Sequence, residues 1–352
     1  MYFEWFVVII GVIGTAANGL VLYALVASKQ HKKHQLIVNQ NALDLYSCVF
    51  LVITYGMKLS NAYLSGSLGY WLCMFIYSEN LFYVGVYASW LNLMILSIDR
   101  YLKVVHSAWS KKYLRKWMTY GAIAGTWISG VVHEMVIVFQ TSAVIDGFCY
   151  GYVIGSPESL LALGIYYFLF TYLLVLAIFI FCYGKILMVI CRQARVMAGH
   201  SASGPSNAQA QSNQKMQSNV IKTLMLVCAF YAVAWLPQKI FVLLIGLDVN
   251  LNYANDAYYV ILSLGFLYIC TTLMIITIKR CLNVVSRVCL SGWQAIMAFK
   301  RIGFMTNRLS FLYICANPFV YATKFDPVRR ILKGLLFCKK ASEPVASSMQ
   351  MT

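Results

Sequence analysis

Charged residues are scarce in this sequence. Of its 352 residues, 11% are charged and 61% are apolar, whereas an average soluble domain carries about 25% charged residues. A soluble globule of this size has too little polar surface to cover so many apolar side chains. The scarcity of charge excludes an ordinary cytosolic enzyme, a disordered chain and a small secreted disulfide scaffold. It leaves a helical protein that crosses a membrane several times.

Several chemical motifs are also missing. No CxxC pair occurs among the 11 cysteines, which removes support for a zinc or thioredoxin-like site. The sequence has no GxxxxGK(S/T) and no GxSxG motif, and His133-Glu134 begins an HExxH motif in which Ile137 replaces the second histidine. The N-terminal residues MYFEW lack the basic region and cleavage site of a removable signal peptide. We therefore expect no enzymatic activity, no metal-binding cluster and no removed leader.

Long apolar runs are what the sequence has instead. A helix needs about 20 mostly apolar residues to cross the hydrocarbon core of a bilayer, and its backbone polar groups must be paired within the helix. Seven runs meet this requirement, and another, 309–323, is shorter. The seven are 5–27, 36–57, 72–98, 117–139, 160–188, 220–245 and 257–278. The sequence predicts an all-α membrane protein with a bundle of seven transmembrane helices.

Positive charge is concentrated in alternate loops. Most of the 28 lysines and arginines lie in or beside 28–35, 99–116, 189–219 and 324–352, whereas the opposite loops hold mainly acidic residues. Because loops rich in lysine and arginine stay in the cytoplasm, this distribution predicts a multi-pass plasma-membrane protein whose N-terminus is outside. Short basic runs between apolar stretches are not the pattern of a nucleic-acid-binding protein.

The C-terminal part differs from the transmembrane domain, which we place at 1–325. Residues 326–338 mix apolar and basic positions after Pro327, a pattern typical of a short amphipathic helix lying in the membrane interface, in contact with lipid. Cys338 at its end is a candidate for acylation. We expect 339–352 to be a disordered cytoplasmic tail.

The pentapeptide FLYIC occurs twice, at 266–270 and at 311–315. Removing 271–315 joins the apolar residues before the first copy to the NPFVY sequence after the second, and creates one continuous span. We interpret 271–315 as an insertion or duplicated segment within one original seventh helix; an exon duplication, a retained intron and a real insertion are alternatives. If 257–278 and 309–323 both span the membrane, the basic tail lies outside. The charge distribution favours NPFVY in the seventh position, with the upstream segment at the periphery.

Each predicted span contributes to one ordered set of motifs. These motifs are Asn18-Gly19, Leu43-Asp44, Cys73, Asp99-Arg100-Tyr101, Trp127, Tyr183, Trp235-Leu236-Pro237 and Asn317-Pro318-Phe319-Val320-Tyr321. With these motifs in this order, nearly the whole chain resembles the rhodopsin-like (class A) G-protein-coupled receptors, and most nearly an orphan branch of that family. The resemblance implies a seven-transmembrane receptor that passes the binding of an extracellular ligand to a cytoplasmic heterotrimeric G protein, with no catalytic residues.

The resemblance also implies a cytoplasmic switch centred on Arg100. Arg100 would pair with Asp99 in the inactive state and turn toward Tyr183 and Tyr321 when helix six swings outward. The residues that the resemblance assigns to the switch and to G-protein coupling are Asp99, Arg100, Tyr101, Tyr183, Asn317, Pro318 and Tyr321. Gln217 replaces the family's acidic partner for this arginine, which predicts raised basal signalling. Taken alone, Arg100 is a positive anchor at the membrane interface.

By the same resemblance, the hinge of helix six consists of Trp235, Pro237 and Tyr231, and a polar core consists of Asn18, Asp44 and Ser89. Asp44 would hydrogen-bond with Asn18, Ser89 and Asn317 and bind a sodium ion, the one cofactor we consider. An ionisable residue within a span costs about 2.5–3.5 kcal/mol on insertion scales and so requires a role. The alternative role for Asp44 is hydrogen bonding between neighbouring helices. Tyr313 and Ile314 stand where the family has further polar sodium ligands.

The ligand pocket implied by the resemblance lies between the outer halves of the helices. Its candidate lining residues are Glu79, Phe82, Tyr83, His133, Glu134 and Lys239. Phe82 occupies the place of the amine-binding aspartate of the family, so we do not expect a monoamine ligand. For Glu79 and Glu134, a position near the water interface is the alternative. The resemblance also implies a disulfide between Cys73 and Cys149 on the oxidising outer side, and the interval from Cys73 to Arg100 is longer than the family norm.

Two rival hypotheses compete with a signalling receptor. A polytopic transporter would show repeats across its two halves and broken helices at the substrate site, but the only repeat in this sequence is local. A non-signalling, decoy or misfolded receptor variant would result if 271–315 disrupted the seventh helix. Comparing surface expression with and without this segment separates the second rival from a functional receptor.

Overall fold

The computed structural model describes residues 2–150 and 157–199 and, after them, shorter stretches. These are 221, 224–232, 234–236, 238–240, 242–243, 247, 311, 313–314, 317–318, 328–329 and 331–332. Pro237, Gln217, Tyr321 and Cys338 lie outside the described residues. So do 339–352, and most of 271–315 and of the expected interfacial helix 326–338, of which the structure describes four helical residues.

Long helices joined by short turns make up most of the described chain. In order they are α1 (Tyr2–Ala27), the 3-10 turn η1 (Gln30–Lys32), α2 (Gln35–Lys58), α3 (Gly66–Leu72), the π-helical η2 (Cys73–Tyr77), α4 (Asn80–Val105), α5 (Ser107–Tyr113), α6 (Lys116–Thr141), α7 (Pro157–Phe168), the π-helical η3 (Leu169–Leu173) and α8 (Leu174–Gly199). Strands β1 (Ala143–Ile145) and β2 (Phe148–Tyr150) form an antiparallel hairpin. Asp146 and Gly147 join the strands with φ angles of 50° and 78°, the left-handed backbone that a two-residue hairpin loop requires.

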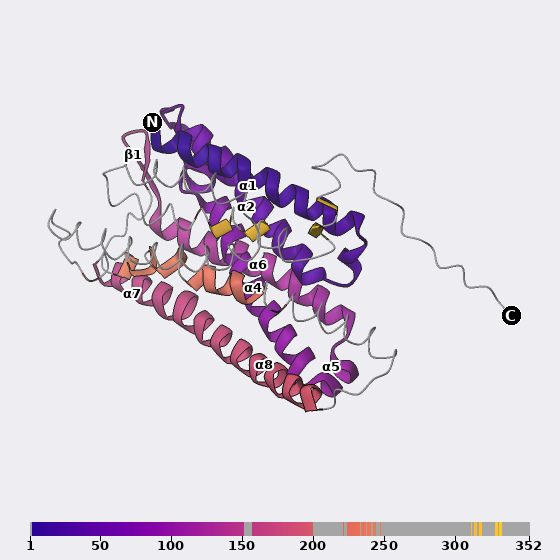
Figure 1. Ribbon diagram of the computed structural model, residues 1–352. Helices are drawn as coiled ribbons and strands as arrows, with labels where there is room; N and C mark the ends of the chain where they lie inside the picture. Colours follow the sequence, from indigo (N-terminus) through magenta and orange to yellow (C-terminus); the bar gives the residue numbers. More distant parts are fainter. Residues whose placement is uncertain are drawn as a thin grey trace.

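Five helical stretches of the described chain are long and apolar enough to cross a membrane, and they coincide with the first five predicted spans. They are Glu4–Ala27, Gln35–Lys58, Gly66–Val105, Lys116–Thr141 and Glu158–Gln193. A shorter apolar helix, Leu224–Ile240, lies within the sixth predicted span. The long helices lie side by side, with the N-terminus and β1 at one end and α5 at the other (Figure 1).

The third span begins differently from the prediction of one helix over 72–98. The backbone passes through the π-helical η2 to Ser78 and then to Glu79, which has a left-handed φ of 66°, before α4 begins at Asn80. A π-helix holds more residues per turn than an α-helix. The long interval between Cys73 and Arg100 is therefore accommodated at this break, while α4 itself continues unbroken to Val105.

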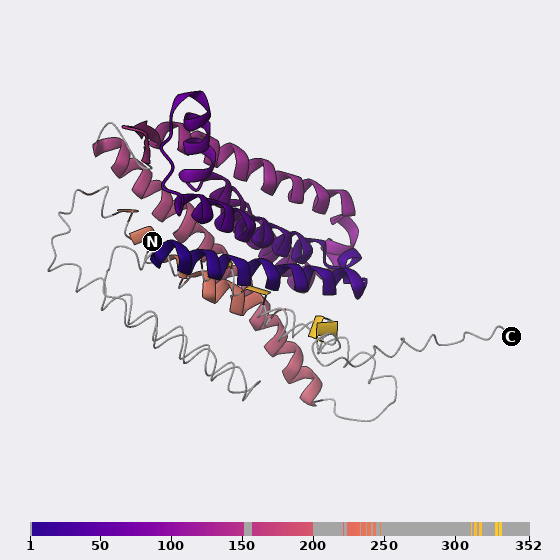
Figure 2. The same cartoon turned by 90° about the horizontal axis from the view of Figure 1, so that it is seen from above.

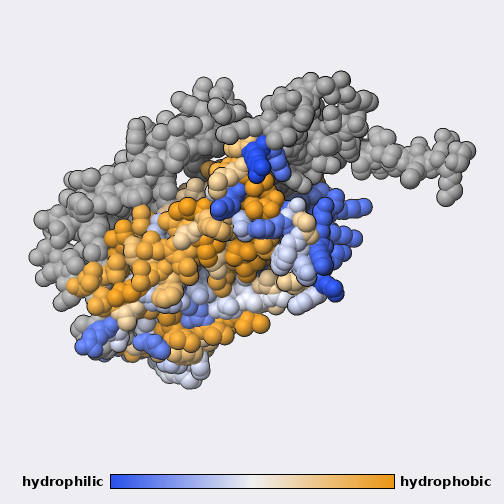
Figure 3. Space-filling model, turned by 90° about the horizontal axis from the view of Figure 1, so that it is seen from below, coloured by the Kyte–Doolittle hydropathy of each residue, from blue (hydrophilic) through white to orange (hydrophobic). Residues whose placement is uncertain are grey.

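Apolar side chains cover much of the outside of the bundle. Ile128 of α6 and Ile180 of α8 are 63% and 66% exposed, as expected for helices whose outer faces contact lipid rather than water. One face of the molecule is apolar across its middle, with hydrophilic residues gathered toward its ends (Figure 3). This distribution agrees with a bundle that lies across a bilayer.

Helix α4 lies at the centre of the bundle. It packs against α2, α6 and α8, and α1 packs on α2 (Figures 1 and 2). The hydrophobic core joins residues of α1, α2, α4 and α8 to the aromatic residues Tyr231 and Trp235 and to Phe311 and Tyr313. Residues far apart in the sequence therefore share one core.

Candidate functional site

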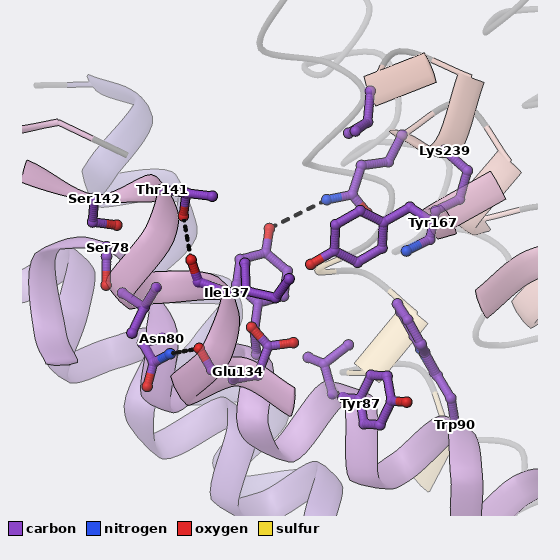
Figure 4. A pocket seen from close by; sticks show the side chains of 15 residues that line it. Ser78, Asn80, Tyr87, Trp90, Glu134, Ile137, Thr141, Ser142, Tyr167 and Lys239 are labelled. Atoms are coloured by element: carbon purple, nitrogen blue, oxygen red, sulfur yellow. Dashed lines mark hydrogen bonds between the residues drawn. The ribbon is translucent and has the colours of Figure 1, made fainter. Parts of the chain in front are cut away.

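A cavity of about 40 Å³ lies between α4, α6, α7 and residues 238–242. Its walls include Asn80, Tyr83, Trp90, Glu134, Tyr167 and Lys239. In Figure 4, Lys239 and Tyr167 approach the cavity from one side, and Asn80 and Glu134 lie on another. Drug-sized ligands occupy pockets of about 300–1,000 Å³, so the cavity as it stands is smaller than such a pocket.

Three of the six predicted lining residues border this cavity: Tyr83, Glu134 and Lys239. Asn80 Nδ2 donates a hydrogen bond of 2.8 Å to the backbone oxygen of Glu134 and so ties α4 to α6. Gln238 Nε2 donates to the Tyr83 hydroxyl at 3.2 Å. The Glu134 side chain is buried within the protein.

Glu79, Phe82 and His133 are placed elsewhere. Glu79 accepts hydrogen bonds from Tyr55 OH at 2.8 Å and from Lys58 Nζ at 2.5 Å, because the break before α4 directs it toward α2. Phe82 is fully buried, with its ring centroid 5.3 Å from that of Phe311. His133 stacks on Tyr87 at 3.8 Å between ring centroids and lines a separate hollow between α6 and α7. The prediction that these three residues line the cavity is corrected accordingly.

A network of buried polar side chains surrounds Asp44 in the middle of α2. Asp44 Oδ1 accepts hydrogen bonds from Ser89 Oγ at 2.8 Å and from Gln40 Nε2 at 3.4 Å, and Oδ2 accepts one from Asn317 Nδ2 at 3.0 Å. Two of the three partners expected for Asp44 are therefore in contact with it. The third, Asn18, donates instead to the backbone oxygens of Gly14 at 3.0 Å and Ile314 at 3.4 Å.

The polar network extends further than the motifs indicated. Asn92 of α4 donates to Gln40 Oε1 at 2.8 Å and to the backbone oxygen of Leu36 at 3.0 Å, and accepts from Asn39 Nδ2 at 2.9 Å. Trp127 Nε1 of α6 donates to Asn39 Oδ1 at 3.0 Å. Sequence reasoning overlooked Gln40, Asn39 and Asn92, although a polar residue within an apolar span is the same signal that singled out Asp44.

The far end of α4 carries Asp99, Arg100 and Tyr101, three of the residues assigned to the switch. Arg100 Nε lies 3.8 Å from Asp99 Oδ2, but Asp99 makes its shorter contact with Lys103, whose Nζ lies 2.7 Å from Oδ1. Arg100 Nη2 lies 3.5 Å from His34 Nδ1, a neighbour that the motifs did not indicate. The Tyr183 hydroxyl lies 3.1 Å from Ser97 Oγ.

Burial and nearby positive charges lower the pKa of His34. Burial of the ring, followed by the nearby charges of Arg100, Lys103 and Lys33, lowers the pKa of His34 from its usual value near 6.5 to about 4. His34 is therefore neutral at physiological pH. Tyr101, the last residue of the DRY motif, has its hydroxyl 3.1 Å from His106 Nε2.

Buried aromatic rings connect the cavity to the bundle core. Trp235 is fully buried and packs edge-to-face on Trp90, with 4.7 Å between ring centroids. Tyr231 OH donates a hydrogen bond of 2.5 Å to the backbone oxygen of Thr171, which ties the sixth span to η3. Pro318 is helical and buried beside Asn317.

The disulfide between Cys73 and Cys149 is present, with 5.3 Å between the two Cα atoms, so this prediction is confirmed. It links η2 to strand β2 at the cavity end of the bundle. The described residues contain no group of three or more His, Cys, Asp or Glu side chains that could hold a metal ion.

Comparison with known proteins agrees with this architecture. The family described as 7 transmembrane receptor (rhodopsin family) matches residues 17–283. The human substance-K receptor is 24% identical over 277 residues, which cover 77% of this chain and 67% of that receptor. Human opsin-5 is 24% identical over 251 residues, 67% of this chain and 63% of the opsin. Human galanin receptor type 1 is 25% identical over 242 residues, 65% of this chain and 63% of that receptor. Because the family match covers most of the chain, this protein belongs to the rhodopsin family of seven-transmembrane receptors.

Proposed function

We propose that this receptor converts the binding of an extracellular ligand in the cavity at Glu134 and Lys239 into nucleotide exchange on a heterotrimeric G protein. Membership of the rhodopsin family makes it a G-protein-coupled signalling receptor, a class whose members are not enzymes in general. The observation that carries the proposal is the layout of α4, which borders the cavity at Asn80, joins the polar core at Ser89 and ends near Arg100.

We infer the orientation of the receptor in the membrane from the charge at the two ends of the bundle. Basic residues cluster around Arg100 in η1, α5 and the end of α4, including Lys32, Lys103, Lys111 and Lys112. Because basic loops stay in the cytoplasm, this end faces the G protein in the plasma membrane. The cavity and the disulfide at Cys73 then face outside, as does the N-terminus.

The switch requires existing contacts of Arg100 to be exchanged for others. Arg100 would leave Asp99 and His34 and turn toward Tyr183 and Tyr321, and Tyr183 would release Ser97. A few kcal/mol of bias is enough to hold such a two-state element in one conformation. Gln217, where the family has an acidic clamp on this arginine, leaves the inactive state with less bias and gives raised basal signalling.

Agonist-free nucleotide exchange tests this proposal. Membranes containing the wild type should stimulate GTPγS binding to a panel of purified G proteins, Arg100→Gln should remove the stimulation, and Gln217→Glu should lower it several-fold. Lys32→Gln, at an exposed position of η1, serves as a control for charge at the same end. An epitope on the N-terminus, detected on intact cells, reports orientation and surface level. Stimulation that does not depend on Arg100 would contradict the mechanism, and unchanged activity in Gln217→Glu would contradict the role of Gln217.

We also propose that Asp44 holds a sodium ion. Its carboxylate lies beside the Ser89 hydroxyl and Asn317, and the buried amide oxygens of Asn317 and Asn18 have no hydrogen-bond partner. Carboxylate, hydroxyl and amide oxygens are suitable ligands for a hard cation. Sodium should raise the thermal midpoint of the wild type relative to N-methylglucamine, and Asp44→Asn should remove the difference. Equal midpoints of the wild type in both salts would contradict the site.

We further propose that the segment ending in NPFVY occupies the seventh-helix position and that 271–315 is an insertion. Phe311 packs on Tyr55 with 5.7 Å between ring centroids, and Asn317 reaches Asp44. Deleting 271–315 replaces one FLYIC copy by the other, so Phe266 and Tyr268 take over the contacts of Phe311 and Tyr313. The shortened receptor should reach the cell surface at least as well as the full chain and retain GTPγS stimulation. Loss of both would contradict the proposal and show that 271–315 is required.

A further inference from the structure

The cavity contains a buried lysine that has no carboxylate partner among the residues that the structure describes. Lys239 is only 3% exposed, and its Nζ lies 4.1 Å from the ring centroid of Trp90, 4.5 Å from that of Tyr167 and 5.7 Å from that of Trp235. Among the described residues, no carboxylate oxygen comes within 4.0 Å of this ammonium group. Three aromatic rings therefore surround the Lys239 ammonium group, and no carboxylate in the described part of the chain forms an ion pair with it.

Placing a charged lysine within a transmembrane helix has an unfavourable insertion free energy. A charged lysine at the centre of a span costs about 2.5–3.5 kcal/mol on insertion scales, and contacts with aromatic faces return only part of this because each is worth about 0.5–2 kcal/mol. The rings favour a cation but carry no net charge. Within the described residues, no anionic group is paired with this lysine.

Glu134 does not supply that anion. It borders the same cavity (Figure 4), but its Oε1 lies 2.9 Å from His133 Nδ1 and makes no ion pair with Lys239 within 4.0 Å. Its position on α6 is further held by the bond from Asn80 to its backbone oxygen. The acidic side chain of the cavity therefore contacts a histidine, whereas the basic one contacts aromatic rings.

We propose that the ligand of this receptor carries a negatively charged group, of the carboxylate type, that forms an ion pair with Lys239 while an aromatic or apolar body packs on Trp90 and Tyr167. This inference rests on the proposed function, because it takes the cavity to be the ligand site. The volume of about 40 Å³ admits a small charged head, and the body of the ligand enters as the surrounding helices separate.

A matched set of probes tests the charge preference on the purified full-length receptor in lipid nanodiscs. Hydrocinnamate, its neutral amide and phenylpropylamine share one aromatic body and differ in charge. Hydrocinnamate should bind the wild type about tenfold or more tightly than the amide, equivalent to about 1.4 kcal/mol, and phenylpropylamine should bind least. Lys239→Gln should remove the preference and Lys239→Arg should retain it. Lys58→Gln, which removes a lysine paired with Glu79 away from the cavity lining, should leave it unchanged.

A second measurement needs no ligand. Replacing a buried charge by an apolar side chain of similar volume is often neutral or stabilising when the charge serves no structural purpose. Lys239→Met should therefore keep or raise the thermal midpoint without probe and abolish the shift that hydrocinnamate produces in the wild type. A lower midpoint would show that Lys239 serves the structure and would overturn the proposal.

The other opposing outcomes are equally definite. Equal binding of the three probes, a preference for phenylpropylamine, no binding of hydrocinnamate to the wild type, or full preference in Lys239→Gln each overturns the inference. None of these readouts uses a G protein. Loss of nucleotide exchange with an intact carboxylate preference would count against the signalling mechanism alone.

Discussion

Helices α4 and α6 are both 26 residues long and both apolar, yet they occupy opposite environments. Buried residues cover most of α4 and leave one stripe, which includes Tyr87, Leu91 and Ile98, less buried, whereas in α6 the buried residues form a single stripe along one side. The stripe consists of Thr126, Gly130, Glu134, Val138 and Thr141. The rest of α6 faces outward with side chains such as Ile128. Apolar character therefore does not mark the core of a bundle in lipid; buried polar groups and small residues do.

The two helices also use polar residues differently. Asn92 of α4 connects three residues of α2 inside the bundle, and Ser89 reaches Asp44. On α6, Thr126 and Glu134 lie within the one buried stripe. Polar side chains of α4 thus make several contacts with α2, whereas α6 combines a packed stripe with hydrogen bonds to Asn80 and Asn39.

The largest effect should follow from breaking the polar contacts of α4. Asn92→Leu removes the donor to Gln40 Oε1 and to the backbone oxygen of Leu36, and the nearest acceptor of Asn39 Nδ2; each buried group left unsatisfied costs about 1–3 kcal/mol. We expect a loss of about 2–4 kcal/mol, visible as a lower thermal midpoint and reduced yield of folded receptor in detergent. Ile128→Leu on the outer face of α6 is the control and should change neither. Equal midpoints for the two variants would refute the contrast.

A smaller effect should come from the packing stripe of α6. A Cβ atom at Gly130 would lie 2.6 Å from the backbone oxygen of Val84, whereas one at Gly121 would meet nothing within 4 Å. Gly130→Ala should therefore push α6 from α4 and cost about 1–3 kcal/mol. Gly121→Ala on the same helix should be neutral or slightly stabilising, because alanine is the better helix former. Thermal midpoints of the two variants measure the difference, and a Gly130→Ala receptor as stable as Gly121→Ala would disprove the close approach.

The smallest effect concerns the end of α4, where Arg100 and Lys103 approach His34. The pKa of His34 is about 4 in the folded receptor and near 6.5 in an unfolded chain. The unfolded state therefore binds more protons between these values, and stability falls as the pH is lowered through this range. The thermal midpoint of the wild type should drop more between pH 7 and pH 5 than that of His34→Gln. Parallel pH profiles would show that the lowered pKa is absent.

How far the sequence predicts the site depends on whether a residue acts locally or across the fold. The pairing of Cys73 with Cys149 and the contacts of Asp44 with Ser89 and Asn317 followed from motif resemblance and are found in the structure. Glu79 was misplaced because its left-handed backbone breaks the helix that the apolar pattern predicted as continuous. A change of backbone direction at one residue moves its side chain from one neighbour to another, and the hydropathy pattern does not reveal such a change.

Hydropathy and charge along the chain were sufficient to establish transmembrane helices, their order and the basic end of the bundle, because the cost of placing each side chain in lipid or water is local. The tertiary structure decided that α4 rather than α6 is central, that Lys239 is enclosed by rings, and that Asn317 meets Asp44. These outcomes depend on which helix faces meet after the chain has folded, and residues from different helices contribute to each of them.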